Sequence, residues 1–241
     1  MRKARPAFGL ALGDLVLDGG SKEEWKANFF GPGAELLASV PQYLAKGNHD
    51  LGGERWLALF CTPTGGMNWQ QRIGPVMLVG LDILLDWTPE SREYQWLETV
   101  LSRSDAPYLF VALHAPPYTT TPHGDLDEGM PRDSLVRKAR EAVLPLAERY
   151  RATAILAGHS HIYERSERPS GLTLVTTGGA GAPLSEPTGN RVEKNPYQKK
   201  FFQEHHYSLI TVSDIDCRLR AVTLDGGVLD ERAWLPRKGG P

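Results

Sequence analysis

Four short apolar runs in this chain each end in polar residues, and this repeated arrangement strongly limits the possible folds. The residues at the four ends are Asp14, Asn48, His114, and His159 with His161. Short apolar runs that alternate with helical patterns are typical of buried strands in an α/β fold. In such folds the loops beyond the carboxyl ends of the strands lie near one another. We therefore expect these five side chains to gather at one edge of a sheet.

The patterns between these motifs predict the remaining elements. Strands are expected at 8–12, 42–45, 76–81, 108–113, 152–156 and 172–176. Helices are expected at 22–30, at 34–39, from Thr88-Pro89-Glu90 onward, and at 134–150, where Pro145 should kink or restart the helix. About residues 205–235 should form an antiparallel β-meander with a turn at Asp225-Gly226. Residues 181–200 are rich in turn formers and predict a mobile loop.

Length and composition favour a single domain over residues 1–241. The chain is 41% hydrophobic, which is enough for one sizeable core. Its formal net charge is -2 and its Lys and Arg residues are scattered, so no nucleic-acid-binding patch is predicted. No apolar run approaches the roughly 18–20 residues of a membrane span. No signal peptide is visible, and the cellular compartment is not determined by the sequence. We expect Cys61 and Cys217 each to be a small core residue, not half of a disulfide.

The residue types at the strand ends are metal ligands. Carboxylate, amide and imidazole donors suit Zn, Mn or Fe better than Cu(I) or an iron–sulfur cluster. Asp14 can bridge two ions, and two ions about 3.5–4 Å apart can activate a water and hold phosphate oxygens. Taken alone, Asp14 or Asn48 could be a turn residue and His114 a buried structural histidine. All these simpler explanations would have to hold together, so a metal site is the better interpretation.

Four motifs resemble, in order, four of the five sequence blocks of the calcineurin-like metallophosphoesterases: Gly13-Asp14, Gly47-Asn48-His49-Asp50, Ala112-Leu113-His114 and Gly158-His159-Ser160-His161. The longer forms, His114-Ala115-Pro116-Pro117-Tyr118, His123-Gly124 and the run from Gly158 to Arg165, are similar to the purple-acid-phosphatase-like branch. The likeness runs from about residue 8 to residue 181. It implies an α/β fold (α+β in some schemes), a four-layer β-sandwich flanked by helices.

The resemblance also implies a role for each metal ligand. Asp14 would bridge two ions. Asn48, His114 and His159 would bind one of them, and His161 would bind the other. All metal-ligand loops then lie within residues 13–165, and the complete fold would hold two divalent or trivalent ions, with Mn, Fe or Zn as candidates.

Three further residues would act on the substrate in this resemblance. His49 would lie outside the metal shell and assist the phosphate or the leaving group, and Asp50 would orient it. His123 would be an active-site loop residue, although a merely exposed histidine explains it equally well. Two roles stay open for Arg165: a contact with the substrate, or an ion pair with Glu164 or Glu167. We expect His205 and His206 to have a strand-edge or surface role.

Two departures from the family pattern are visible. The family begins with an Asp-x-His or Asp-x-Gly block on a first strand, whereas the 13 residues before Asp14 contain no Asp or His. We therefore expect the N-terminal strand to be missing and the second ion to be poorly held. The purple branch places a Tyr three residues after the bridging carboxylate, and this chain has Leu17 there.

These observations support two functions from different classes. The first is hydrolysis of a small phosphate ester by a metal-activated water, with monoester and diester both open. The alternative is a non-catalytic or weakly active metal- or phosphate-binding domain, since the first motif is absent. A homo-oligomer that covers the open strand edge is a third possibility.

Overall fold

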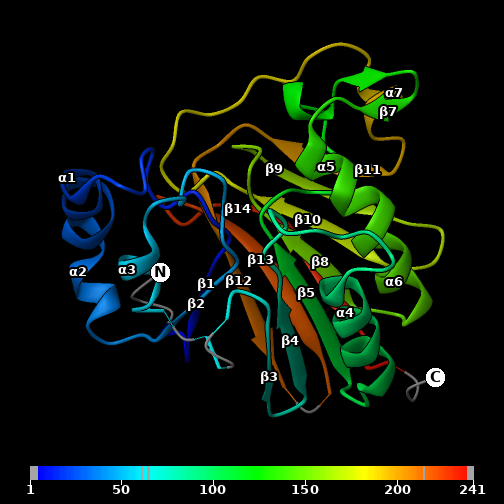
Figure 1. The fold of residues 1–241 in the computed structure, drawn as a ribbon, viewed down its shortest axis with the longest axis horizontal. Helices are drawn as coiled ribbons and strands as arrows, with labels where there is room; N and C mark the ends of the chain where they lie inside the picture. The colour runs from blue at the N-terminus through cyan, green and yellow to red at the C-terminus, as the bar shows by residue number, and fades with distance from the viewer. Residues whose placement is uncertain (1–4, 61, 64–65, 214, 238–241) are drawn as a thin grey trace.

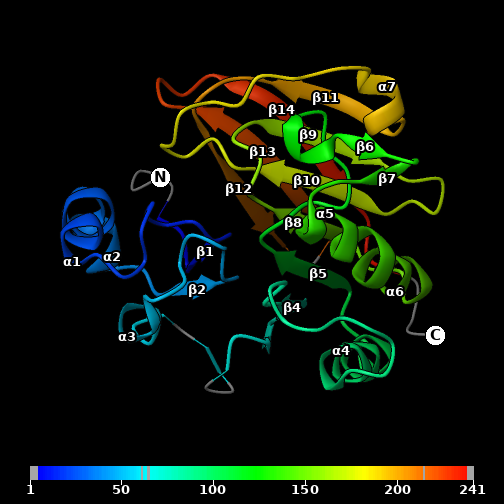
Figure 2. The same ribbon diagram turned by 45° about the horizontal axis from the view of Figure 1, so that its top comes forward.

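The computed structural model describes residues 5–60, 62–63, 66–213 and 215–237. Two layers of β-structure lie between two layers of helices, as Figures 1 and 2 show. One helical layer is N-terminal and holds α1 to α3, and the other holds α4 to α6. The architecture is therefore the α/β sandwich expected from the sequence.

The larger sheet has seven strands in the order β11-β9-β10-β8-β5-β4-β3. Its strands are β3 (Trp69–Ile73), β4 (Val76–Gly80), β5 (Tyr108–Leu113), β8 (Ala154–Ala157), β9 (Tyr163–Glu167), β10 (Thr173–Thr177) and β11 (Gln198–Phe202). The four strands β4, β5, β8 and β10 run parallel to one another. Every residue of β5 is buried, as expected for a strand covered on both faces.

Helices α4 (Arg92–Arg103), α5 (Ser134–Lys138) and α6 (Leu144–Arg149) cover one face of this sheet. A π-helical turn, Ala139–Val143, joins α5 to α6 just before Pro145, so the predicted restart is confirmed. The predicted start of α4 at Thr88 is wrong. Thr88 is bonded to the carboxylate of Asp86 in a turn, and the Ser91 hydroxyl caps the helix instead.

The second β-layer has two parts. Strands β1 (Gly9–Ala11) and β2 (Gln42–Leu44) pair in parallel, and β12 (His206–Val212), β13 (Cys217–Thr223) and β14 (Val228–Trp234) form the predicted antiparallel meander. Both parts pack against the larger sheet through one apolar cluster, to which Leu10, Tyr43, Leu219 and Trp234 contribute. Cys217 is a buried free thiol in this cluster, whereas Cys61 lies outside the described residues.

The fourth layer covers β1 and β2. It consists of α1 (Lys22–Glu24), a π-helical segment (Trp25–Phe30), α2 (Gly31–Leu37) and α3 (Glu54–Leu57). The predicted break between 30 and 34 is wrong, because α1, the π-helical segment and α2 form one continuous helical run. In the π-helical turn the Gly31 N–H bonds to the Lys26 carbonyl, and this shifted pattern accommodates Pro32, which has no N–H to donate.

Two further expectations need correction. The turn-rich segment 181–200 is not one loop, because it contains α7 (Arg191–Lys194) and the start of β11. For His206 the strand-edge alternative holds and the surface alternative is wrong. It is the first residue of the edge strand β12 but is buried, and its ring bonds to Thr177 Oγ1 and to the Glu204 carbonyl. The remaining short elements are β6 (Leu126–Asp127), β7 (Met130–Pro131) and a 3₁₀ turn at Pro122–Gly124. Within the described part of the chain, none of the helices combines the length and apolar character needed to cross a bilayer.

Candidate metal centre

The loops that carry the predicted ligands adopt an uncommon backbone conformation. Asp14 and His159 have φ values of 53° and 64°, and Gly13 has φ 84°. Positive φ costs energy for a residue with a Cβ, and such strain concentrates at functional sites. Two of the five predicted ligands therefore occupy strained positions at the ends of β1 and β8.

These loops also approach one another very closely. A Cβ on Gly13 would lie 2.5 Å from the Gly47 nitrogen and 2.6 Å from His114 Nδ1. A Cβ on Gly47 would lie 2.3 Å from Asp14 Oδ1. Glycine at both positions lets the loops after β1 and β2 meet the end of β5. The site thus joins the two β-layers, with Asp14 and Asn48 from one layer and His114 and His159 from the other.

His114 is fully buried at the carboxyl end of β5. Its Nδ1 lies 2.7 Å from the Leu12 carbonyl oxygen. Because a carbonyl oxygen only accepts hydrogen bonds, Nδ1 carries the proton and donates it. The other ring nitrogen of neutral His114, Nε2, is therefore an unprotonated acceptor.

His159 is 8% exposed and is fixed in the opposite tautomer. Its Nε2 lies 2.9 Å from Asp133 Oδ2, and a carboxylate also accepts only, so Nε2 donates. Its Nδ1 is then unprotonated. This nitrogen faces His114 Nε2 at 3.0 Å, and Asp14 Oδ2 lies 3.0 Å from the same His114 atom.

Three lone pairs, one each from Asp14, His114 and His159, thus converge at one point. Lone pairs at this separation repel one another unless a metal ion or a proton on His114 Nε2 lies among them. Asn48 on the adjacent loop has a buried Oδ1 with no hydrogen-bond partner among the described residues, and an amide oxygen is a suitable fourth ligand. The donor set therefore fits a metal ion.

The pKa values of these groups follow from the same contacts. Burial favours a lower pKa for His114, but the hydrogen bond and charge of Asp14 outweigh it and raise the pKa above its ordinary value. Burial favours a higher pKa for Asp14, but His114 and the His49 N–H lower it. Burial lowers the pKa of His159. A metal ion would compete with a proton for His114 Nε2, so binding would release that proton.

His49 and Asp50 do not contact each other in the expected way. His49 is exposed; its ring Nδ1 lies 2.8 Å from the carbonyl of Leu17, and its backbone N–H donates to Asp14 Oδ1. Asp50 has no exposed surface, and its carboxylate accepts from the backbone N–H groups of Asp14, Leu15 and Gly47, each at 2.9 Å. Burial raises the pKa of Asp50. Asp50 therefore ties the two ligand loops together.

The other two predicted histidines lie differently. His161 is half-buried, and its Nδ1 lies 2.8 Å from the Pro183 carbonyl. Among the described residues it is absent from both groups of side chains that are arranged to hold an ion. His123 belongs to the second of these groups, with Asp133 and His159. Its Nδ1 lies 2.8 Å from Asp133 Oδ2, and its ring centroid lies 3.9 Å from that of His159.

Asp133 was not predicted from the sequence. Its position before the helix at 134 is a capping signal, but its two histidine partners are distant in sequence. Burial favours a higher pKa for Asp133, yet the hydrogen bonds from His123 and His159 hold the pKa well below its usual range.

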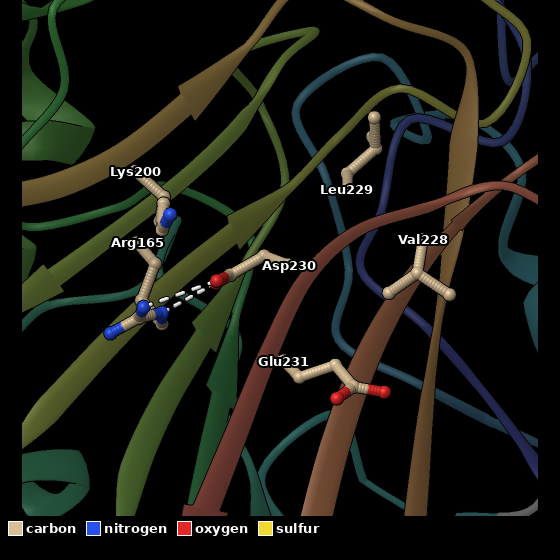
Figure 3. A pocket seen from close by; sticks show the side chains of 6 residues that line it. All are labelled: Arg165, Lys200, Val228, Leu229, Asp230 and Glu231. Carbon is tan, nitrogen blue, oxygen red and sulfur yellow. Dashed lines mark hydrogen bonds and ion pairs between the residues drawn. The ribbon is translucent and has the colours of Figure 1, made fainter.

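Arg165 is not part of this group. It lines a hollow of ≈ 500 Å³ with Lys200, Val228, Leu229, Asp230 and Glu231, none of them a predicted metal ligand (Figure 3). Its guanidinium pairs with Asp230 and Glu167, so the ion-pair interpretation holds for Glu167. Glu164 instead accepts from Asn195, Gln198 and the Thr120 N–H.

With this fold and this group of donors, the chain belongs to the calcineurin-like phosphoesterase family, which matches residues 2–163. Within that family it is similar to the purple acid phosphatases. It is 30% identical over 198 residues to purple acid phosphatase 22 of Arabidopsis thaliana. The matched region covers 71% of this chain and 43% of that protein. It is 31% identical over 103 residues to the Fe(3+)-Zn(2+) purple acid phosphatase 12 of Arabidopsis thaliana, or 42% of this chain and 20% of that protein. The chain thus spans less than half the length of these relatives.

Solved structures show the same fold. The purple acid phosphatase PPD1 from yellow lupin superposes with a TM-score of 0.79 at 20% identity, over 96% of this chain and 47% of that chain. The GAP50 anchor of the Plasmodium inner membrane complex superposes with a TM-score of 0.75 at 14% identity, over 98% of this chain and 81% of that chain.

Proposed function

We propose that this chain hydrolyses small phosphate esters with metal ions held by Asp14, Asn48, His114 and His159. The observation that carries the proposal is the convergence of three possible ligand atoms: His114 Nε2 lies 3.0 Å from Asp14 Oδ2 and 3.0 Å from His159 Nδ1. Divalent or trivalent ions are the proposed cofactor, with Mn, Fe or Zn as candidates. The name of the Fe(3+)-Zn(2+) relative supports that choice.

The chain's own residues would divide the work as follows. A bound ion supplies a Lewis acid that acidifies a water and holds phosphate oxygens. His49 is exposed beside Asp14, and its Nδ1 donates to the Leu17 carbonyl. The ring in its doubly protonated form would donate a second hydrogen bond, from Nε2, to the departing oxygen. Asp50 holds the two ligand loops at a fixed separation. His123 lies on the ring of His159 and would contact the phosphate or its substituent.

A metal- or phosphate-binding domain without catalysis is the rival proposal. His161 lies outside both candidate groups in the described structure, which leaves the second ion with few ligands. The GAP50 structure shares the architecture and is described as an anchor. A shared fold does not specify an activity, so this neighbour favours neither proposal over the other.

The test compares the purified chain with His114→Ala and His159→Ala. We expect metal content, measured by mass spectrometry, and hydrolysis of an aryl phosphate monoester and diester to fall together in both variants. His205→Ala is the matched control, because within the described structure its ring makes one hydrogen bond, to the Gly179 carbonyl. Tight metal binding by the unmodified chain without hydrolysis of either ester would favour the binding domain.

A further inference from the structure

Asp133 stands at the N-cap of α5 and uses its two carboxylate oxygens differently. Oδ1 accepts from the backbone N–H groups of Leu135 at 2.9 Å and Val136 at 3.3 Å. These bonds satisfy donors that a helix start leaves free, and they fix the carboxylate in one orientation. Oδ2 is thereby directed away from the helix.

Oδ2 meets two histidines. His159 Nε2 lies 2.9 Å from it, and His123 Nδ1 lies 2.8 Å from it. Both distances are those of N–H···O hydrogen bonds with a charged acceptor. Both ring nitrogens therefore donate to one oxygen whose position is set by the helix.

We infer that Asp133 is a positioning residue of the metal centre, which dedicates His159 Nδ1 to the ion and holds His123 beside it. This inference rests on the proposed function. A carboxylate opposite Nε2 allows only the tautomer in which Nε2 is protonated, so the lone pair is at Nδ1, on the side of Asp14 and His114. A ligand histidine with its second nitrogen bound in this way is both oriented and more basic.

The same three residues do not form a second ion site in this arrangement. Each of the two contacts at Oδ2 is a hydrogen bond whose proton occupies the space between the two atoms. His159 would also have to lose both ring protons to bind ions on both sides.

Two substitutions separate the capping role from the histidine role. In Asp133→Asn the amide oxygen caps the helix, so the NH₂ group replaces Oδ2 and donates toward His159 Nε2. The proton of His159 must then move to Nδ1, where it opposes a metal ion. In Asp133→Ser the hydroxyl still caps the helix, and no group either fixes or reverses the tautomer.

The experiment measures the His159 tautomer by ¹⁵N NMR in the chelator-treated protein and Zn²⁺ affinity by calorimetry. We expect Nε2–H in the unmodified chain and Nδ1–H in Asp133→Asn, with the Zn²⁺ Kd raised roughly 10–100-fold in Asp133→Asn. Asp133→Ser should bind Zn²⁺ with intermediate affinity. Asp127→Asn, which changes an exposed carboxylate on β6, is the matched control and should bind Zn²⁺ as the unmodified chain does.

An unchanged tautomer in Asp133→Asn, or Zn²⁺ binding no weaker than in Asp133→Ser, would overturn the inference. Loss of one whole equivalent of Zn²⁺ in Asp133→Ser, with the remaining affinity unchanged, would also overturn it and make Asp133 a ligand. If the unmodified chain bound no metal, the proposed function would fail, and the tautomer would still decide the role of Asp133. Melting temperatures near that of the unmodified chain would confirm that both variants keep the helix cap.

Discussion

Removal of the Asp50 carboxylate tests whether one buried side chain holds the two ligand loops. It is fully buried and accepts three backbone N–H bonds, from Asp14 and Gly47 at Oδ2 and from Leu15 at Oδ1. An unsatisfied buried donor costs about 1–3 kcal/mol. Asp50→Ala leaves three such donors, so we expect a loss of roughly 3–9 kcal/mol in the free energy of unfolding.

Asp50→Asn should cost less, because one oxygen remains. If the amide oxygen takes the place of Oδ2, the Asp14 and Gly47 donors stay bonded and only the Leu15 N–H faces the NH₂ group. One unsatisfied donor corresponds to about 1–3 kcal/mol. Removal of a buried charge offsets part of this cost, because burial already raises the pKa of Asp50.

Urea denaturation of the chelator-treated protein measures these differences, and calorimetry measures Zn²⁺ binding. Zn²⁺ affinity should fall in the same order as stability, because the loops carry Asp14 and Asn48. Asp18→Asn is the matched control: Asp18 is exposed and its Oδ1 accepts one N–H, from Gly20, so the change should stay within about 0.5 kcal/mol. An Asp50→Ala loss below about 1 kcal/mol, or equal losses in both Asp50 variants, would refute this reasoning.

Four further predictions follow from other parts of the structure. His49→Ala should keep its metal content yet lose roughly 10²-fold or more in kcat; proportional losses of metal and activity would make His49 a ligand. Gly13→Ala should lower the melting temperature and Zn²⁺ affinity together, since φ is 84° and the new Cβ would lie 2.5 Å from a backbone nitrogen. Burial raises the pKa of Cys217 from 9.0 to about 12. Its contribution to stability is therefore complete below about pH 9 and is lost as the pH rises toward 12, by about 1.4 kcal/mol per pH unit. Between pH 9 and 10, urea denaturation of a Cys61→Ser variant should show this slope, and the slope should fall by the same amount when Cys217→Ala is added. Finally, mass spectrometry should find one tightly held ion per chain and a weakly held second, because His161 lies outside both candidate groups in the described structure; two tight equivalents would contradict this.

The strand-end motifs were predictable because their signals are local. Asp14, Asn48, His114 and His159 each follow an apolar run within a few residues, and the parallel order of the strands brings their ends together. The meander was predictable for the same reason, since its alternation and its turn at Asp225-Gly226 lie within one segment.

The functions of Asp50 and Asp133 were not predictable in this way. Each carboxylate has partners that are distant along the chain. Asp50 accepts from Asp14, 36 positions away, and Asp133 accepts from His123 and His159, 10 and 26 positions away. Sequence spacing shows a capping residue before a helix, but not which histidine approaches its free oxygen. β3 and β11 were missed because their sequences, Trp69–Ile73 and Gln198–Phe202, are largely polar and are strands only through pairing with a neighbour.

The site joins two β-layers, and this has a mechanical consequence for the whole molecule. An ion bound by Asp14 and Asn48 on one side and His114 and His159 on the other, as proposed, would act as a cross-link between the N-terminal layers and the seven-stranded sheet. A ligand at a hundred times its Kd stabilises the folded state by about 2.7 kcal/mol. Because the cross-link lies between layers, that energy resists their separation, so a chelator should make the N-terminal 60 residues the first segment open to a protease.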